Sequence, residues 1–167
     1  MKKVTVLMAA LCIFTSFSFF ICYAEPIVKD HKQKYEVEIK ELKNVMETNN
    51  AGIKKLEKRI DSMEDELRKT FAIIFDKRMT ANELQVDILK DRQEHIIKNI
   101  QQISETDKRL KALYTEANVC IKEKHYEQAL ENFGDVVDMQ ERLLEQLNEY
   151  SKEIFNFTQL IKSHYNE

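Results

Sequence analysis

The sequence predicts an all-α protein, a bundle of three long antiparallel helices with coiled-coil character. The chain has 167 residues but only two glycines and one proline, so few positions interrupt a helix. Apolar residues recur at heptad spacing over most of its length, which is typical of helices that pack along an a/d seam. An apolar N-terminal segment precedes this region and indicates where the protein functions.

Residues 1–24 have the features of a secretory signal peptide. Two lysines form a positive end, an uncharged apolar stretch follows, and Cys22 and Ala24 are the small residues expected before a cleavage site at Glu25. We therefore expect cleavage after Ala24 and a periplasmic or secreted protein. Two alternatives stay open. The segment could be retained as an N-terminal membrane anchor, because ~20 apolar residues span a bilayer, or a cysteine could be lipidated.

The composition narrows the range of functions. The chain has 26 basic and 29 acidic residues, and removal of the two leader lysines would leave a net charge of −5. This balance argues against nucleic acid as a partner, because binding phosphates requires a basic face. Only one of the three cysteines, Cys120, lies outside the leader, so no intrachain disulfide is expected. Cys120 is either a buried core residue or an exposed residue that links two chains.

The first helix is expected over residues of about 30–78. Its a positions are Ile39, Met46, Ile53, Ile60, Leu67 and Ile74, and its d positions are Leu42, Asn49, Leu56, Met63 and Thr70. Nine of these eleven residues are apolar, which favours a coiled-coil seam over a generic amphipathic helix. Asn49 is either a buried amide that fixes the register or a polar residue near a frayed end beside Gly52.

A turn is expected near Met79 and Thr80. Residues 80–83 have capping-box spacing, and Met79 and Leu84 are placed to form a hydrophobic staple. One uninterrupted helix is the alternative, because neither glycine nor proline marks the turn.

Two further helices are expected over about 80–122 and 126–165. The a positions of the second are Val86, Gln93, Ile100, Asp107 and Tyr114, and its d positions are Leu89, Ile96, Ile103, Leu110 and Ala117. The a positions of the third are Phe133, Gln140, Leu147, Ile154 and Ile161, and its d positions are Val136, Leu143, Tyr150, Phe157 and His164. Near-equal helix lengths favour a three-helix bundle in one domain over an extended coiled-coil arm followed by a hairpin. Gly134 lies inside the third helix, where it either allows a close helix approach or is simply tolerated.

Five residues near the second turn occupy the repeat positions of a known helical hairpin: Leu113, Ala117, Tyr126, Ala129 and Phe133. On these residues the stretch from Leu113 to Val137 resembles a single tetratricopeptide repeat. The resemblance implies a hairpin used for docking proteins. The stretch departs from the pattern at Lys124, usually glycine, at Cys120, usually aromatic, and in lacking the closing proline. Only one repeat is visible, whereas a solenoid needs about three.

The layout of the whole chain adds two broader resemblances. A leader, a coiled coil and a tetratricopeptide-like hairpin in this order look like a short version of certain bacterial envelope factors. The small, lysine-rich secreted chain is also similar to haemolysin or holin accessory proteins of spirochaete prophages, a resemblance that no motif carries.

No residue pattern resembles a catalytic, cofactor or metal site. None of the four histidines, which are His31, His95, His125 and His164, begins a metal-ligand helix motif. The acidic residues lie at intervals that pair with lysine on outer helix faces. We therefore expect a protein that is not an enzyme and that has no cofactor.

The strongest candidate for partner binding is the apolar run at residues 71–75. Phe71, Ile73 and Phe75 make the first helix apolar on every side, and Phe155 is expected near the same end of the bundle. These residues either fill the bundle cap or form an exposed tip that docks a protein or touches a membrane.

Together these features favour a non-catalytic secreted or periplasmic adaptor or scaffold, acting through coiled-coil and tetratricopeptide-like protein–protein contacts. A homo-oligomer is compatible with the heptads, and the sequence does not identify the protein partner. The alternative is a membrane-associated accessory protein of a haemolysin- or holin-like lysis system.

Overall fold

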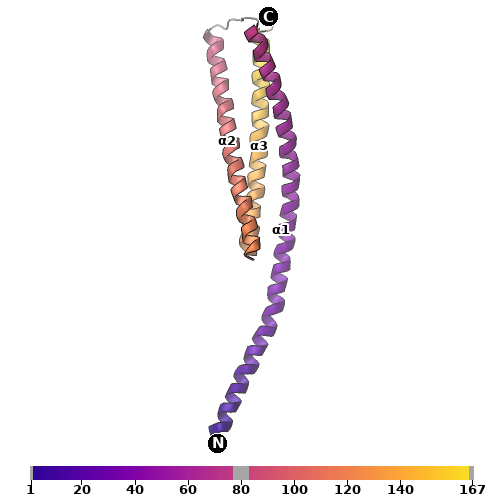
Figure 1. The fold of residues 1–167 in the computed structure, drawn as a ribbon, viewed down its shortest axis with the longest axis vertical. Helices are drawn as coiled ribbons and strands as arrows, with labels where there is room; N and C mark the ends of the chain where they lie inside the picture. Colours follow the sequence, from indigo (N-terminus) through magenta and orange to yellow (C-terminus); the bar gives the residue numbers. More distant parts are fainter. Residues whose placement is uncertain (1, 77–82, 166–167) are drawn as a thin grey trace.

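The computed structural model describes residues 2–76 and 83–165, and these residues form three helices and no strand. Helix α1 is Lys2–Asp76, α2 is Glu83–Lys122 and α3 is Tyr126–Tyr165. The side chains are described for residues 32–73 and 87–163. Figure 1 shows the helices running side by side, with α3 between α1 and α2. The predicted all-α bundle is confirmed.

Helices α1 and α2 are separate elements. Helix α1 ends at Asp76 and α2 begins at Glu83, and both pack against α3. The alternative of one uninterrupted helix spanning the first and second segments is therefore wrong. The expected capping box and staple lie mostly in residues 77–82, outside the described residues.

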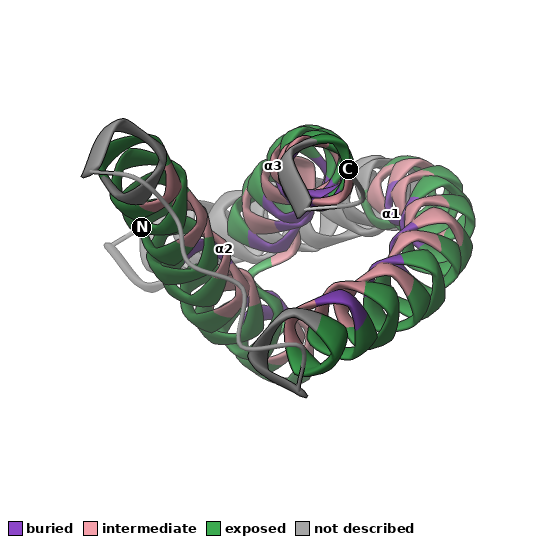
Figure 2. Cartoon of the chain, turned by 90° about the horizontal axis from the view of Figure 1, so that it is seen from above, coloured by how far each residue is buried: buried purple, intermediate pink, exposed green. Residues whose placement is uncertain are grey.

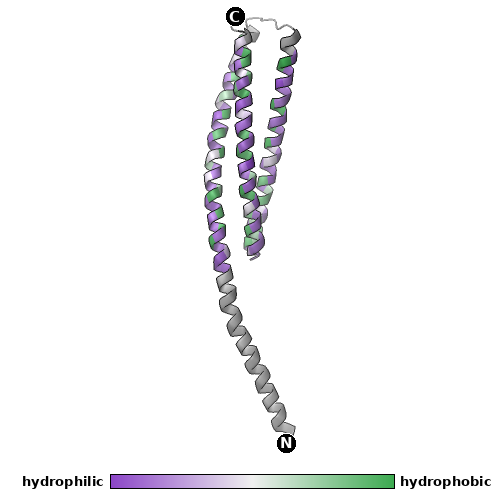
Figure 3. Ribbon diagram, turned by 180° about the vertical axis from the view of Figure 1, so that it is seen from behind, coloured by the Kyte–Doolittle hydropathy of each residue, from purple (hydrophilic) through white to green (hydrophobic). Residues whose placement is uncertain are grey.

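Helix α3 is the centre of the bundle. All of its expected seam residues with described side chains are buried: Phe133, Val136, Gln140, Leu143, Leu147, Tyr150, Ile154, Phe157 and Ile161. Apolar positions alternate with hydrophilic ones along its length (Figure 3). Because α3 has a neighbour on each side, its buried stripe is wider than a two-helix seam requires and includes Val137.

The seam of α1 also lies against α3. The a residues Ile39, Met46, Ile53 and Ile60 are buried, and the d residues Leu42, Leu56 and Met63 pack against the same apolar clusters. The expected coiled-coil face of α1 is thus the face that the bundle buries, and the outer positions remain exposed (Figure 2).

The buried polar contact of this seam is made by Gln140 and not by Asn49, the residue expected from the sequence. Helix α1 is continuous through Asn49 and Gly52, so a frayed end there is wrong. The Nδ2 of Asn49 has no hydrogen-bond partner among the described residues. Instead, Nε2 of the buried Gln140 donates to Oδ1 of Asn50 at 2.8 Å and to the carbonyl oxygen of Met46 at 3.3 Å. Gln140 therefore joins α3 to α1 at one level of the bundle.

Helix α2 departs from its expected seam. Of its expected d residues, Ala117 is fully buried, and Leu89, Ile96 and Ile103 pack against the apolar clusters. The a residues Gln93, Ile100 and Tyr114 are exposed. The reason is that α3 is the only described helix whose backbone packs closely against α2. In the described part of the chain, α1 contacts α3 and α2 contacts α3, but no Cα atoms of α1 and α2 lie within 8 Å of each other. One apolar row is enough for a single neighbour.

The turn between α2 and α3 is a Schellman motif. The amide of His125 donates to the carbonyl of Cys120 at 2.9 Å, and the amide of Lys124 donates to that of Ile121 at 3.1 Å. Lys124 has a φ of 65°, a left-handed conformation that costs a non-glycine residue roughly 1 kcal/mol. The backbone thus adopts the conformation that glycine favours, at the position where the tetratricopeptide pattern has glycine.

The two helix glycines differ in their surroundings, which leads to a prediction. A Cβ atom at Gly134 would meet nothing within 4 Å, whereas one at Gly52 would lie 3.2 Å from Cδ2 of Leu144. We expect Gly134→Ala to raise the free energy of unfolding by about 1 kcal/mol through helix propensity. Gly52→Ala should gain less, because Leu144 must move. Urea denaturation of both variants checks this, and equal gains would show that Leu144 does not pack closely on α1.

Candidate functional site: the groove between α1 and α2

No Cα atoms of α1 and α2 lie within 8 Å of each other, and two hollows lie between these helices, one after the other along α3. The upper hollow, nearer the connection between α1 and α2, has a volume of about 350 Å³. Its apolar lining comes from all three helices: Ile60, Ile100, Ile103, Leu143 and Leu147. The lower hollow, nearer the turn between α2 and α3, has a volume of about 400 Å³ and is lined by Met46, Leu110, Tyr114 and Val136 among others. We call the two hollows together the α1–α2 groove.

Acidic side chains surround the upper hollow. Glu57, Asp61 and Glu64 lie on the α1 side, and Asp107 lies on the α2 side. Asp107 is paired with Lys111 of its own helix, and Glu64 is paired with a neighbouring arginine. Glu57 and Asp61 form no ion pair among the described residues. The upper half of the groove therefore carries uncompensated negative charge beside an apolar floor.

The lower hollow has mixed charge. Lys43, Glu47 and Lys111 line it, and the ammonium group of Lys43 lies 4.9 Å from the centre of the Phe133 ring, within the range of a cation–π contact. Gln140 also lines this hollow, and its Oε1 accepts no hydrogen bond from the described residues. The lower half of the groove therefore contains both positively and negatively charged side chains.

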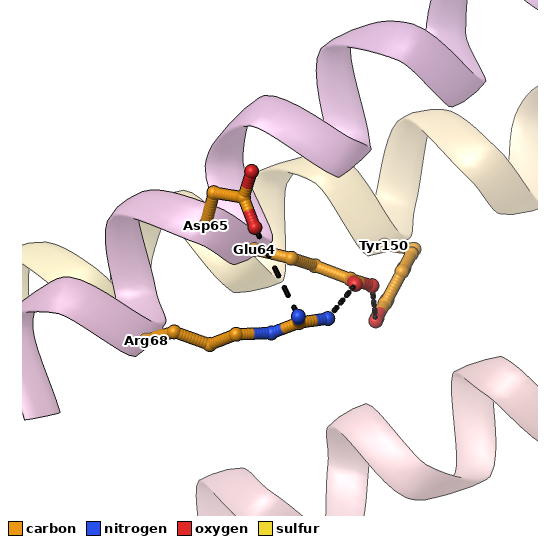
Figure 4. A network of polar contacts seen from close by, with 4 residues as sticks. All are labelled: Glu64, Asp65, Arg68 and Tyr150. Atoms are coloured by element: carbon orange, nitrogen blue, oxygen red, sulfur yellow. Dashed lines mark hydrogen bonds and ion pairs between the residues drawn. The ribbon is translucent and has the colours of Figure 1, made fainter.

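A polar network joins α3 to α1 at the edge of the upper hollow (Figure 4). The hydroxyl of Tyr150 donates to Oε1 of Glu64 at 2.7 Å. Arg68 lies 3.5 Å from the Glu64 carboxylate and 3.9 Å from that of Asp65. Burial of Tyr150 raises the pKa of its hydroxyl above the ordinary value, and the hydrogen bond to Glu64 raises it further. The positive charge of Arg68 lowers the pKa of Tyr150, but by less than burial and Glu64 raise it.

The raised pKa of Tyr150 predicts a pH dependence of stability. In the unfolded chain the hydroxyl loses its proton near pH 10.0, whereas in the folded chain it holds the proton to higher pH. The stabilisation from this network is thus fully present below that pH and is lost as the pH rises above it. We expect wild-type stability to fall more steeply than that of Tyr150→Phe between about pH 9 and pH 11, measured by urea denaturation. Tyr114→Phe, which removes a hydroxyl outside this network, is the control for the substitution itself.

The structure places one candidate residue of the apolar run in the core and leaves two others exposed. The Phe71 ring packs edge-on against Phe157 with centroids 5.9 Å apart, so it belongs to the core. Ile73 and Phe155 are 53% and 52% exposed, and neither belongs to an apolar cluster of the described residues. The side chain of Phe75 lies outside the described residues. The docking surface expected at Phe71, Ile73, Phe75 and Phe155 remains a prediction.

Four of the five hairpin residues, by contrast, come together. The fifth, Tyr126, lies outside their cluster and has the ammonium group of Lys32 at 5.8 Å from its ring centre. Ala117, Ala129 and Phe133 are buried in one cluster, and Leu113 packs against it. Cys120 is buried in the same cluster, which agrees with its interpretation as a core residue. Since these side chains hold the hairpin together, they are not free to contact a partner.

Sequence reasoning missed the groove, although one signal was present. The a row of α2 contains Gln93 and Asp107, and a row buried between two helices would seldom carry both. Polar residues on this row indicate a face without a second neighbour.

The described residues offer no other obvious site. Within them, no three His, Cys, Asp or Glu side chains are grouped so that they could hold a metal ion. Among the residues with described side chains, 32–73 and 87–163, no helical stretch is long and apolar enough to cross a membrane.

Comparison of the chain with protein-family models, with curated proteins and with solved structures finds no match in any of the three. The class of protein is therefore defined by the fold alone: a three-helix bundle with a groove between its outer helices.

Proposed function

We propose that the chain is a non-catalytic helical adaptor or scaffold that binds another protein in the α1–α2 groove. The observation that carries this proposal is the wide backbone separation of α1 and α2, beside which Ile100 and Tyr114 are each 45% exposed on the walls of a groove with an apolar floor. Exposed apolar side chains beside a hollow with an apolar floor are typical of an interaction site.

The geometry favours a helix as the docked element. The helices of a four-helix bundle form a ring, so each helix contacts two neighbours. When three of the four are present, the middle helix contacts the other two, and a fourth helix would lie between those two. Here α3 contacts α1 and α2, and the described residues form no fourth helix that bridges α1 and α2. The tetratricopeptide-like hairpin supports the same function indirectly, because it holds α2 against α3 and so positions one wall of the groove.

In vivo photo-crosslinking tests this proposal. A photoreactive phenylalanine at position 114 should give a discrete adduct with another protein in the producing cells. The adduct should disappear when Ile100→Glu places a charge in the same groove. The control is the same probe at position 155 on the exposed side of α3. Absence of an adduct at position 114, or equal adducts from both positions, would contradict groove binding.

We also propose that the adaptor acts in the periplasm or outside the cell. The support for this location is the leader in residues 1–24. Mass spectrometry of the protein recovered from its producing cells should find an N-terminus at Glu25. An intact Met1 or a lipidated cysteine would contradict it.

A further inference from the structure

We infer that the occupant of the α1–α2 groove is an amphipathic partner helix with lysine or arginine beside its apolar stripe. This inference rests on the proposed function and specifies the chemistry of the partner. Three features of the groove carry it: its length, the distribution of its apolar residues and its charge.

The length of the groove fits a helix. On α1 the two hollows extend from Lys43 to Glu64, and on α2 they extend from Ile100 to Thr115. At the α-helical rise of ~1.5 Å per residue, the α1 side is about 30 Å long, which matches a helix of roughly 20 residues. A small molecule would fill only one of the two hollows.

The apolar residues lie along the whole groove rather than at one point. Leu147 and Ile103 line the upper hollow, Val136 and Leu110 line the lower one, and the exposed Ile100 and Tyr114 extend the apolar surface up the α2 wall. A helix with apolar residues at i, i+3, i+4 and i+7 would contact this line of side chains over its full length.

The negative charge of the groove specifies which residues should flank the apolar stripe of the partner helix. Glu57 and Asp61 are one turn apart on α1, both line the upper hollow, and neither is ion-paired among the described residues. A partner helix lying in the groove would place its flanking positions next to these carboxylates. Lysine or arginine there would be attracted, and glutamate or aspartate would be repelled.

A second copy of this chain is a less suitable occupant. The chain carries 29 acidic and 26 basic residues, so a second copy brings net negative charge to a negative groove. A self-associated dimer is nevertheless one outcome that the experiment distinguishes.

The test uses two synthetic helical peptides of about 20 residues. They share leucine at the a and d positions and differ only in carrying lysine or glutamate at the flanking e and g positions. Binding to the full chain, as its producing cells process it, is measured by fluorescence anisotropy, and the oligomeric state is measured by light scattering. We expect the lysine peptide to bind about tenfold more tightly than the glutamate peptide, with a preference that decreases as salt is raised.

Charge reversal identifies the contact. The double variant Glu57→Lys with Asp61→Lys should weaken the lysine peptide about tenfold and remove its preference over the glutamate peptide. The matched control is Glu145→Lys with Glu149→Lys, a pair with the same spacing at exposed positions of α3 outside both hollows. It should change the affinity less than about twofold. Circular dichroism verifies folding, and Ile100→Glu should weaken both peptides if they lie in the groove.

The outcomes separate this inference from the proposed function. Equal binding of the two peptides, or an unchanged preference in the Glu57 and Asp61 variant, overturns the basic partner but leaves groove binding intact. A dimer that binds neither peptide overturns the inference in favour of a second copy. A monomer that binds neither peptide also overturns it, and the crosslinking at position 114 then decides whether the adaptor function fails as well.

Discussion

Replacing Phe133 with alanine is expected to lower the free energy of unfolding by about 3–5 kcal/mol. The Phe133 side chain is 0% exposed, and it lies in the cluster that joins all three helices near the second turn. Its ring meets Tyr114 edge-on with centroids 6.2 Å apart and lies under the ammonium group of Lys43. The truncation would leave a cavity and remove both ring contacts. Against a total stability of roughly 5–15 kcal/mol, this loss is a large fraction.

Phe155→Ala is the matched control, because it removes the same atoms from an exposed position of the same helix. We expect it to change the free energy of unfolding by less than about 0.5 kcal/mol. Urea denaturation of the two variants measures the difference. Similar losses for both would mean that Phe155 is buried, for example against a second chain.

Replacing Ile60 with aspartate is the second change with a large expected effect. Ile60 is buried on α1 and packs against Leu143 and Leu147 of α3. The new carboxylate would lose its hydration without gaining a cation, since the nearest charged residues of the upper hollow are Glu57 and Asp61. An unpaired buried charge costs several kcal/mol, so we expect loss of the cooperative helical unfolding transition at room temperature.

The control for this change is Lys58→Asp, which places the same side chain at an exposed position on α1. Its melting curve, followed by circular dichroism, should remain close to that of the wild type. If Ile60→Asp melts like Lys58→Asp, then the α1 seam is not buried against α3 and the arrangement of the bundle is different.

The sequence predicted the seams of α1 and α3 well, for a physical reason. Residues such as Ile53 on α1 and Leu147 on α3 lie between packed helices, so the heptad pattern and the burial coincide. The a row of α2 was predicted less well. A heptad shows that a helix has an apolar face, but it does not show how many neighbours cover that face. For this reason Ile100 and Tyr114 were expected in a seam, although they line a groove.

The polar positions show the same limit. Asn49 and Gln140 are both amides on seam rows, and spacing alone does not tell which one finds a partner on another helix. The hydrogen bond from Gln140 to Asn50 depends on the level at which α3 lies against α1. The groove likewise depends on how three helices are placed, whereas the apolar run at 71–75 was found because its residues are neighbours in sequence.

Hydroxyl-radical footprinting of the full chain tests the central claim, an open groove that accepts a helix, most directly. We expect Ile100 and Tyr114 to be oxidised readily in the free protein, whereas Phe133 is protected. Addition of the lysine peptide should protect Ile100 and Tyr114 and leave the exposed Phe155 unchanged. Protection of Ile100 and Tyr114 equal to that of Phe133 in the free protein would show that the groove is already covered, and would contradict the account.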